Sequence, residues 1–194
     1  MTKTRLEAFT DGVIAILITI MVLELPQPAG PTWTALAADP HFLPKLLAYV
    51  LSFFFIAIYW NNHHHMWHVV DRVDGAVMWA NMHLLFWLSL IPWATAWLGD
   101  HPRESVPTAV YGIVVLMPAI AYTLLTGAII RLQGRHSRLA AAIGRDVKGK
   151  ASLVLYASAI GLAFVRPWVS DLIFVTVALI WLVPDRRISS RVEA

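Results

Sequence analysis

Residues 5–25 read RLEAFTDGVIAILITIMVLEL, and this stretch decides the class of fold. Between Asp11 and Glu24 it holds no charged side chain. A membrane core is about 30 Å thick and an α-helix rises about 1.5 Å per residue, so about 20 apolar residues span it. The stretch therefore predicts a membrane-spanning helix. A cleaved signal peptide is the competing interpretation, but no small-residue cleavage site follows Leu25, so we expect a helix of the mature chain.

The composition agrees with a membrane location. Of the 194 residues, 58% are hydrophobic and 14% are charged, whereas soluble domains carry about 25% charged residues. The chain has no cysteine, which excludes disulfides, thiolate metal sites and cysteine nucleophiles. We predict an all-α integral membrane protein.

Six apolar stretches are candidate spans, and together they predict a single six-helix transmembrane domain over residues 1–194. They cover residues 6–25, 43–62, 76–98, 106–130, 150–165 and 168–184. The last two are short, and the Arg166-Pro167 step between them predicts a tight turn. Pro118 lies inside the fourth stretch and predicts a kink there.

The basic residues predict the orientation. An even number of spans places both termini on one side with Lys3, Arg5, Arg72, Arg131, Arg135, Arg138, Arg145, Lys148, Lys150, Arg186, Arg187 and Arg191. The other side holds Lys45, Arg103 and Arg166. Because cytoplasmic loops collect Lys and Arg, we predict cytoplasmic termini.

Two long connections differ in character. Residues 26–42 are rich in Pro and Ala and predict an outer loop. The basic segment 131–150 carries an apolar centre at 139–143, which predicts a short cytoplasmic helix on anionic lipid headgroups. A solvated basic loop is the alternative.

The first span has two different sides. At about 100° per residue, one side carries an aliphatic stripe with one hydroxyl, formed by Ile16, Thr19, Ile20 and Leu23. Asp11 points away from this stripe, toward neighbouring helices of the same subunit. An ionisable residue inside a membrane is a candidate functional residue, although a hydrated acid near a helix N-terminus is equally consistent with its position. Taken alone, the stripe is more typical of a lipid-facing or core surface than of a pore.

Histidines gather at the end of the second span, at His63, His64, His65 and His68. His64 and His68 have the spacing of two metal ligands on one helix face, with Asp71 as the nearby acid. A histidine here could instead pair with His83 as axial ligands of a haem. A third interpretation is hydrogen bonding to buried partners such as Asp11.

Other motifs are uninformative or missing. Tryptophans near the span ends are typical of an interfacial belt, namely Trp33, Trp60, Trp67, Trp93, Trp97 and Trp168. The sequence contains no nucleophile elbow, phosphate loop or zinc-protease motif. We therefore predict no catalytic residues and no enzyme activity.

Three dispersed motifs resemble the transmembrane protein 175 family of endosomal and lysosomal potassium channels and their single-repeat prokaryotic relatives. Arg5-(three residues)-Phe9-Thr10-Asp11 resembles the family's Arg-x-x-x-Phe-Ser-Asp signature, with Thr10 in place of the signature Ser. The stretches 59–64 (YWNNHH), 79–81 (WAN) and 85–93 (LFWLSLIPW) resemble the ends of its second helix and its third helix.

The resemblance implies a potassium-permeable, moderately selective cation channel in a prokaryotic plasma membrane, built as a homotetramer with the first helices around the pore. It implies no cofactor, no resident metal and no Thr-Val-Gly-Tyr-Gly filter, and this chain has none of that filter. Carried onto this sequence, Ile16 is the narrowest gate, Thr19 or Ile20 the next layer and Leu23 the outer layer. The signature network behind this helix comprises Arg5, Phe9, Thr10, Asp11, His63, His64 and Asn81. The competing functions are a histidine-based haem or metal protein and a membrane scaffold without transport.

Overall fold

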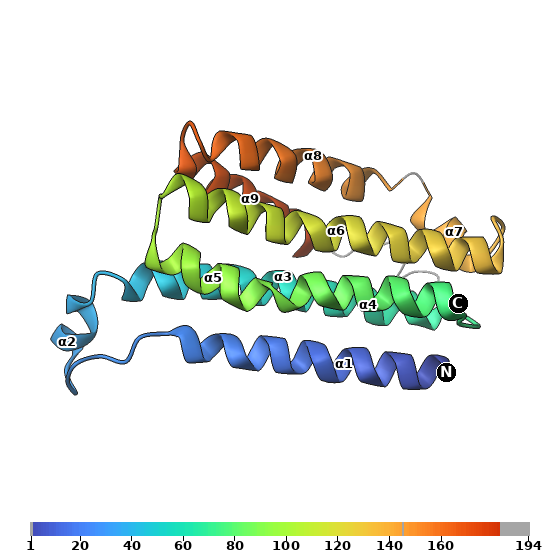
Figure 1. The fold of residues 1–194 in the computed structure, drawn as a ribbon, viewed down its shortest axis with the longest axis horizontal. Helices are drawn as coiled ribbons and strands as arrows, with labels where there is room; N and C mark the ends of the chain where they lie inside the picture. The colour runs from blue at the N-terminus through green and yellow to red at the C-terminus, as the bar shows by residue number, and fades with distance from the viewer. Residues whose placement is uncertain (1, 145, 183–194) are drawn as a thin grey trace.

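The computed structural model describes residues 2–144 and 146–182, which fold into long helices lying side by side (Figure 1). In chain order the helices are α1 Lys3–Ile20, the 3₁₀ helix η1 Met21–Glu24, α2 Trp33–Ala38, α3 Phe42–His68, α4 Gly75–Ser89, α5 Ile91–Asp100, α6 Ser105–Gln133, α7 Arg138–Ile143, α8 Val147–Leu162 and α9 Pro167–Leu182. Helix α1 forms one edge of the bundle and contacts α3 and α4, while α6 lies between α4 and α8. The described residues thus form an all-α bundle with α1 at its margin.

Four helical stretches in the described part of the chain are long and apolar enough to cross a membrane. They cover Lys3–Glu24, Phe42–His68, Gly75–Asp100 and Ser105–Gln133, and match the first four predicted spans. Helices α8 and α9 have 16 residues each, which corresponds to about 24 Å and is shorter than a membrane core. Residues 183–184 of the sixth predicted span lie outside the described residues, as do Arg145, Arg186, Arg187 and Arg191.

The third predicted span is two helices rather than one. Helix α4 ends at Ser89 and α5 begins at Ile91, with Leu90 between them. Pro92 lies in the first turn of α5, where a missing N–H costs nothing, whereas within a continuous helix it would remove a hydrogen bond. Pro118 behaves differently, because α6 continues through it without interruption.

Beyond this break, α5 belongs to a different part of the bundle from α4. Thr95 in α5 donates from Oγ1 to Ser52 Oγ of α3 at 2.6 Å, and Ser52 Oγ lies 2.9 Å from the Tyr111 hydroxyl of α6. All three side chains are buried. At the end of α5, Lys45 Nζ lies 2.7 Å from Asp100 Oδ1. Helix α5 is therefore bonded to α3, whose Ser52 is in turn bonded to α6, and it also packs against α6.

The α8–α9 hairpin has the turn that the Arg166-Pro167 step predicts. The backbone N–H of Arg166 donates to Leu162 O at 2.8 Å, and α9 begins at Pro167. Ser170 Oγ then donates to Ala159 O at 2.7 Å and joins the two helices.

The two long connections contain short helices. Helix α2 lies in the predicted outer loop, is capped by Thr32 and buries no side chain. Helix α7 confirms the helix predicted near 139–143, but its apolar side is not free for headgroups. Leu139 and Ala142 are buried against the bundle, which leaves the basic Arg138 exposed.

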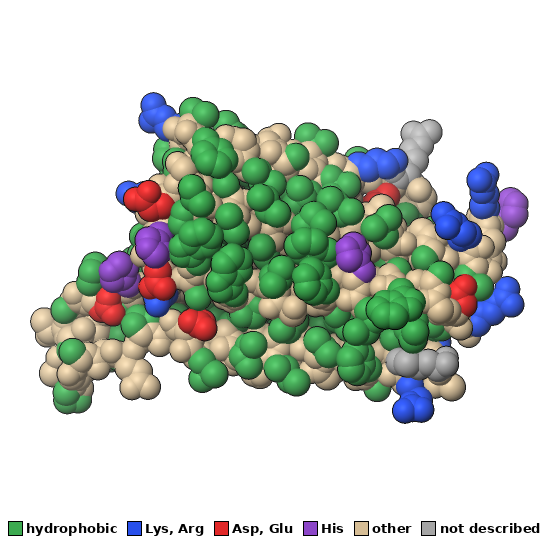
Figure 2. All heavy atoms as spheres, viewed as in Figure 1, with side chains coloured by type: hydrophobic (Ala, Val, Ile, Leu, Met, Phe, Trp, Pro, Cys, Tyr) green, Lys and Arg blue, Asp and Glu red, His purple; other side chains and the backbone are tan. Residues whose placement is uncertain are grey.

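The surface has the distribution expected in a membrane. Hydrophobic side chains cover the middle of the visible face, while charged side chains gather toward its two ends (Figure 2). Inside the bundle, Trp67, Tyr111 and Phe174 are among the largest side chains with no exposed surface. The described residues therefore have a filled apolar interior and, in addition, an apolar outer surface.

Close packing around α6 gives the first prediction. A Cβ atom added at Gly112 would lie 2.9 Å from Ile160 Cγ1 and 3.1 Å from Phe174 Cζ, whereas one at Gly127 meets nothing within 4 Å. We expect Gly112→Ala to lower the free energy of unfolding by about 1 to 3 kcal/mol through overpacking. The matched control Gly127→Ala should raise it by about 0.5 to 1 kcal/mol. Thermal unfolding of the detergent-purified protein tests this, and equal shifts for the two variants would contradict it.

Candidate functional site

Helix α1 has one buried side and one exposed side. Leu6, Thr10, Ile14 and Leu17 are buried, and they recur at helical spacing toward α3 and α4. On the other side, Ile16 is 59% exposed, Ile20 39% and Leu23 79%, and Thr19 is also exposed. The stripe identified in the sequence is therefore the side of α1 that this chain leaves uncovered.

A chain of buried hydrogen bonds holds the other side of α1. Thr10 Oγ1 donates to Leu6 O at 2.9 Å and accepts from Asn81 Nδ2 at 2.8 Å. Asn81 Oδ1 lies 2.8 Å from His63 Nε2. Thr10, Asn81 and His63 come from α1, α4 and α3, and none has exposed surface. These bonds connect three helices through one continuous polar chain.

The chain of bonds determines the protonation of His63. The Asn81 amide nitrogen donates to Thr10, so the Asn81 oxygen faces His63 and requires a donor from Nε2. Trp67 Nε1 lies 2.8 Å from Nε2 and 3.0 Å from Nδ1, and because Nε2 carries the proton given to Asn81, Nδ1 is the nitrogen left to accept from Trp67. Hydrogen atoms are assigned here from the network. Under this assignment His63 is neutral, and the polar side chains of Thr10, Asn81 and His63 are each hydrogen-bonded.

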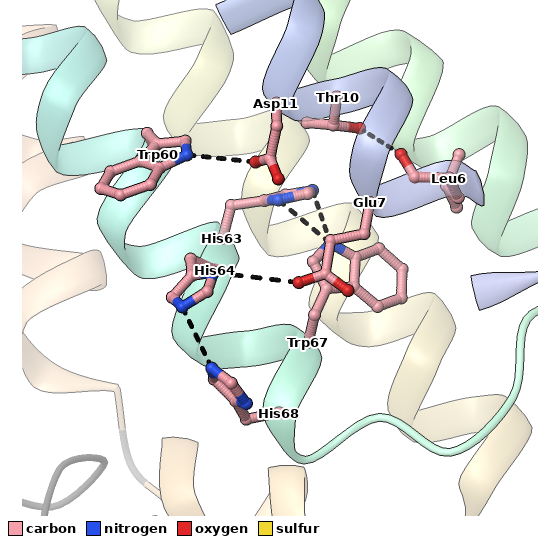
Figure 3. Close-up of polar contacts among 9 residues, drawn as sticks. All are labelled: Leu6, Glu7, Thr10, Asp11, Trp60, His63, His64, Trp67 and His68. Atoms are coloured by element: carbon pink, nitrogen blue, oxygen red, sulfur yellow. Dashed lines mark hydrogen bonds and ion pairs between the residues drawn. The ribbon is translucent and has the colours of Figure 1, made fainter. Parts of the chain in front are cut away.

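A second set of contacts lies nearer the surface, also between α1 and α3 (Figure 3). Trp60 Nε1 donates to Asp11 Oδ1 at 3.1 Å. Glu7 Oε1 lies 3.8 Å from His64 Nδ1, and His64 Nε2 lies 3.1 Å from His68 Nε2. Asp11 therefore points toward α3 of its own chain, on the side away from the aliphatic stripe.

The structure does not bring all the signature residues together. Thr10, Asp11, His63, His64 and Asn81 lie along the α1–α3–α4 contact. Arg5 and Phe9 are exposed on α1, and among the described residues neither takes part in these polar contacts.

The histidines do not gather into a haem or closed metal site. His83 Nε2 accepts from Trp87 Nε1 at 2.8 Å, one turn along the same helix. Over the described ranges, no group of three or more His, Cys, Asp or Glu side chains has the arrangement of a metal site. Nothing in the geometry favours the histidine-based haem function.

Two tryptophans have roles that the sequence interpretation missed. Trp67 was expected in an interfacial belt, and this is wrong: its side chain has no exposed surface and donates to His63. Trp60 is 42% exposed, but its indole N–H is bonded to Asp11. The four-residue spacing of His63 and Trp67 is a signal that would have suggested their pairing.

An acidic residue was also missed. Asp171 lies in the second turn of α9, and its Oδ1 is buried without a hydrogen-bond partner among the described residues. The rule that singled out Asp11, that an ionisable residue within a span is a candidate, applies to Asp171 as well.

Comparison with known proteins matches the segment that contains Thr10, His63 and Asn81 to a channel family. The family model described as "Endosomal/lysosomal potassium channel TMEM175" matches residues 5–92, which include both ends of the Thr10–Asn81–His63 chain. A potassium channel of Chryseobacterium sp. is 49% identical over 193 residues, covering 100% of this chain and 99% of that protein. A potassium channel of Streptomyces collinus is 38% identical over 172 residues, covering 83% and 82% of the two chains.

A solved structure is similar over the whole length. The crystal structure of a lysosomal potassium-selective channel TMEM175 homologue from Chamaesiphon minutus superposes with a TM-score of 0.76 at 29% sequence identity. The match covers 99% of this chain and 98% of that chain, so the similarity extends through α8 and α9.

The buried hydrogen bonds give the second prediction. Thr10→Val keeps the shape of the side chain but leaves Asn81 Nδ2 without an acceptor, which should lower the free energy of unfolding by about 1 to 3 kcal/mol. Thr10→Ser keeps the hydroxyl and should lose less. The control Thr123→Val removes an exposed hydroxyl whose one partner among the described residues is Ala119 O, and it should change stability by less than about 0.5 kcal/mol. Melting temperatures in detergent test the order, and a Thr10→Val protein as stable as Thr123→Val would contradict it.

Proposed function

The chain belongs to the TMEM175 family of endosomal/lysosomal potassium channels, and from this membership we propose that it is a potassium-permeable, moderately selective cation channel. Membership makes the protein an ion channel of a membrane and not an enzyme. Potassium as the permeant ion is supported by the names of the Chryseobacterium and Streptomyces relatives. The proposal requires no cofactor.

The observation that carries the proposed pore is the uncovered side of α1. A single chain leaves Ile16, Ile20 and Leu23 exposed on the first helix, whose other side is bonded to α4 through Asn81. In the proposed homotetramer, four copies of α1 turn this side toward a central axis. The pore is then lined by one helix per subunit, and the remaining helices form the surrounding wall.

The side chains on this stripe explain how such a pore works. Four Ile16 side chains at the axis form a dry constriction that a hydrated ion does not cross, and opening requires the α1 helices to turn or separate. Thr19 or Ile20 forms the next layer and Leu23 the outer layer. Thr19 Oγ1 donates to backbone oxygens of α1, at 2.9 Å to Ala15 O, which leaves lone pairs on its oxygen for a partly dehydrated ion. Selectivity arises because potassium loses water more readily than sodium. Since this difference in dehydration is the basis of discrimination, the preference for potassium is moderate.

The proposed topology has six spans with both termini in the cytoplasm of a prokaryotic cell. Support comes from the four long apolar helical stretches, followed by the α8–α9 hairpin. At the end of the bundle where α1 begins lie Arg72 and the α6–α8 connection with Arg131, Arg135 and Arg138. These residues satisfy the positive-inside rule, and we propose that the exposed arginines around α7 contact anionic headgroups while Leu139 and Ala142 pack on protein.

The position of the gate gives the third prediction. Replacing Ile16 by Asn in four subunits wets the constriction and should raise potassium flux into proteoliposomes about tenfold, the effect of lowering the barrier by about 1.4 kcal/mol. The matched control is Val154→Asn on α8, whose side chain is 65% exposed compared with 59% for Ile16. This control should leave flux unchanged.

Empty vesicles and valinomycin calibrate that measurement. Flux that responds equally to the two substitutions would remove Ile16 from the gate but retain the channel. If intact protein gives no flux in either form, the proposed function is wrong.

The anchoring of α1 gives the fourth prediction. Asp11→Ala removes the acceptor of Trp60 Nε1 between α1 and α3, so it should reduce the fraction of tetramer, or the flux, by more than it changes the potassium-to-sodium ratio. Asp11→Asn retains a carbonyl oxygen for Trp60 and should have a smaller effect. Size-exclusion chromatography with light scattering and paired flux assays measure both quantities. A normal tetramer with lowered selectivity would contradict a structural role for Asp11.

A further inference from the structure

The last two turns of α3 present a pair of histidines, His64 and His68, that lie outside the buried Thr10–Asn81–His63 hydrogen bonds. His64 and His68 lie four residues apart, with ring centroids separated by 4.6 Å. Their Nε2 atoms are 3.1 Å apart and face each other (Figure 3). The His64 side chain is 38% exposed and His68 is exposed, so both rings are reached from solvent.

The separation of the two nitrogens matches what a metal ion requires. With metal–nitrogen bonds of about 2.0 to 2.1 Å, two ligands at right angles lie about 2.9 Å apart, and two at a tetrahedral angle lie about 3.35 Å apart. The observed 3.1 Å falls between these values. In this structure one nitrogen donates a proton to the other, and a metal ion bound to both nitrogens, to the side of the line between them, replaces that proton.

The surroundings of His64 fix the ring in the orientation that a ligand needs. Trp60 stacks on it with a centroid distance of 5.7 Å and an interplanar angle of 17°. Glu7 Oε1 lies 3.8 Å from Nδ1, the nitrogen that does not face His68. A carboxylate near the second nitrogen of a ligating histidine favours the tautomer whose other nitrogen binds metal and raises its basicity. Glu7 is on α1, so this support comes from a different helix.

We propose that His64 and His68 form a bidentate site for a divalent transition-metal ion of the Ni²⁺, Cu²⁺ and Zn²⁺ class, with Glu7 as the positioning carboxylate. Imidazole nitrogens suit these ions, whereas Mg²⁺ and Ca²⁺ prefer oxygen ligands. Within the ranges that the structure describes, no third histidine or acid completes a cage around the pair. Water fills the remaining coordination positions, and the bound ion exchanges with solvent.

Metal binding at this position strengthens the link between α1 and α3. The ion adds positive charge to the His64 ring and draws Nδ1–H toward Glu7, so the contact at 3.8 Å becomes a charge-assisted one. A ligand that binds only the folded state also raises the melting temperature. The inference does not depend on ion conduction, and it is tested by binding to the protein alone.

The test is a titration of the full chain with NiCl₂ in detergent, using protein purified without a histidine tag. Isothermal titration calorimetry and quenching of tryptophan fluorescence both report binding, the latter because Trp60 stacks on His64. His68→Ala should weaken Ni²⁺ binding at least tenfold and remove the metal-dependent rise in melting temperature. The matched control is His136→Ala, an exposed histidine of the α6–α7 connection, which should bind Ni²⁺ as the unmodified chain does.

Two further variants separate ligation from folding. His68→Gln keeps a polar side chain at this exposed position, and it should elute and melt like the unmodified protein while also losing Ni²⁺ binding. Glu7→Gln keeps the ligands but removes the positioning charge, and it should weaken binding about tenfold. Equal affinity in the unmodified, His68→Ala and His68→Gln proteins overturns the site. Unchanged affinity in Glu7→Gln overturns the role of Glu7.

Discussion

A polar side chain buried within a membrane protein must find its partner inside the protein, and the position of α1 depends on this constraint. Thr10, Asn81 and His63 are fully buried on three different helices, and each satisfies the next. Displacing α1 along its axis or turning it would leave Asn81 Nδ2 without its acceptor, at a cost of about 1 to 3 kcal/mol. Apolar contacts carry no directional requirement, so the Asn81–Thr10 and Trp60–Asp11 bonds constrain the position of the first helix more than apolar packing does.

The two sides of α1 thus have separate physical tasks. The side with Leu6, Thr10 and Ile14 is completed within one chain, whereas the side with Ile16 and Leu23 has no partner among the described residues of that chain. In the proposed tetramer the second side meets its symmetry copies, so assembly and conduction use the same side chains. The anchoring side is then free to keep its geometry while the lining of the pore varies.

Helix positions and the orientation of α1 were predictable, because both depend on periodicity. The spacing of about 100° per residue correctly placed Asp11 on a different side of α1 from the aliphatic stripe, and hydropathy located the first four spans. Individual partners were not predictable, since they depend on which helices meet. Asn81 rather than Asp11 bonds His63, and Trp67 is buried rather than interfacial. The break at Leu90 was not predicted, because the hydropathy of residues 76–98 is continuous, although Pro92 was a local signal for it.

The break at Leu90 also divides one membrane crossing into two helices that are held by different neighbours. Helix α4 contacts α1 and α6 and supplies Asn81, while α5 is bonded to α3 through Thr95 and, at its far end, through Asp100 to Lys45. The regular helical hydrogen bonding is interrupted at Leu90, whose N–H donates to Trp87 O while its carbonyl accepts from Ala94 N. Among the described residues, the first helix is therefore hydrogen-bonded to the α4 half of this crossing, whereas the α5 half is held through α3.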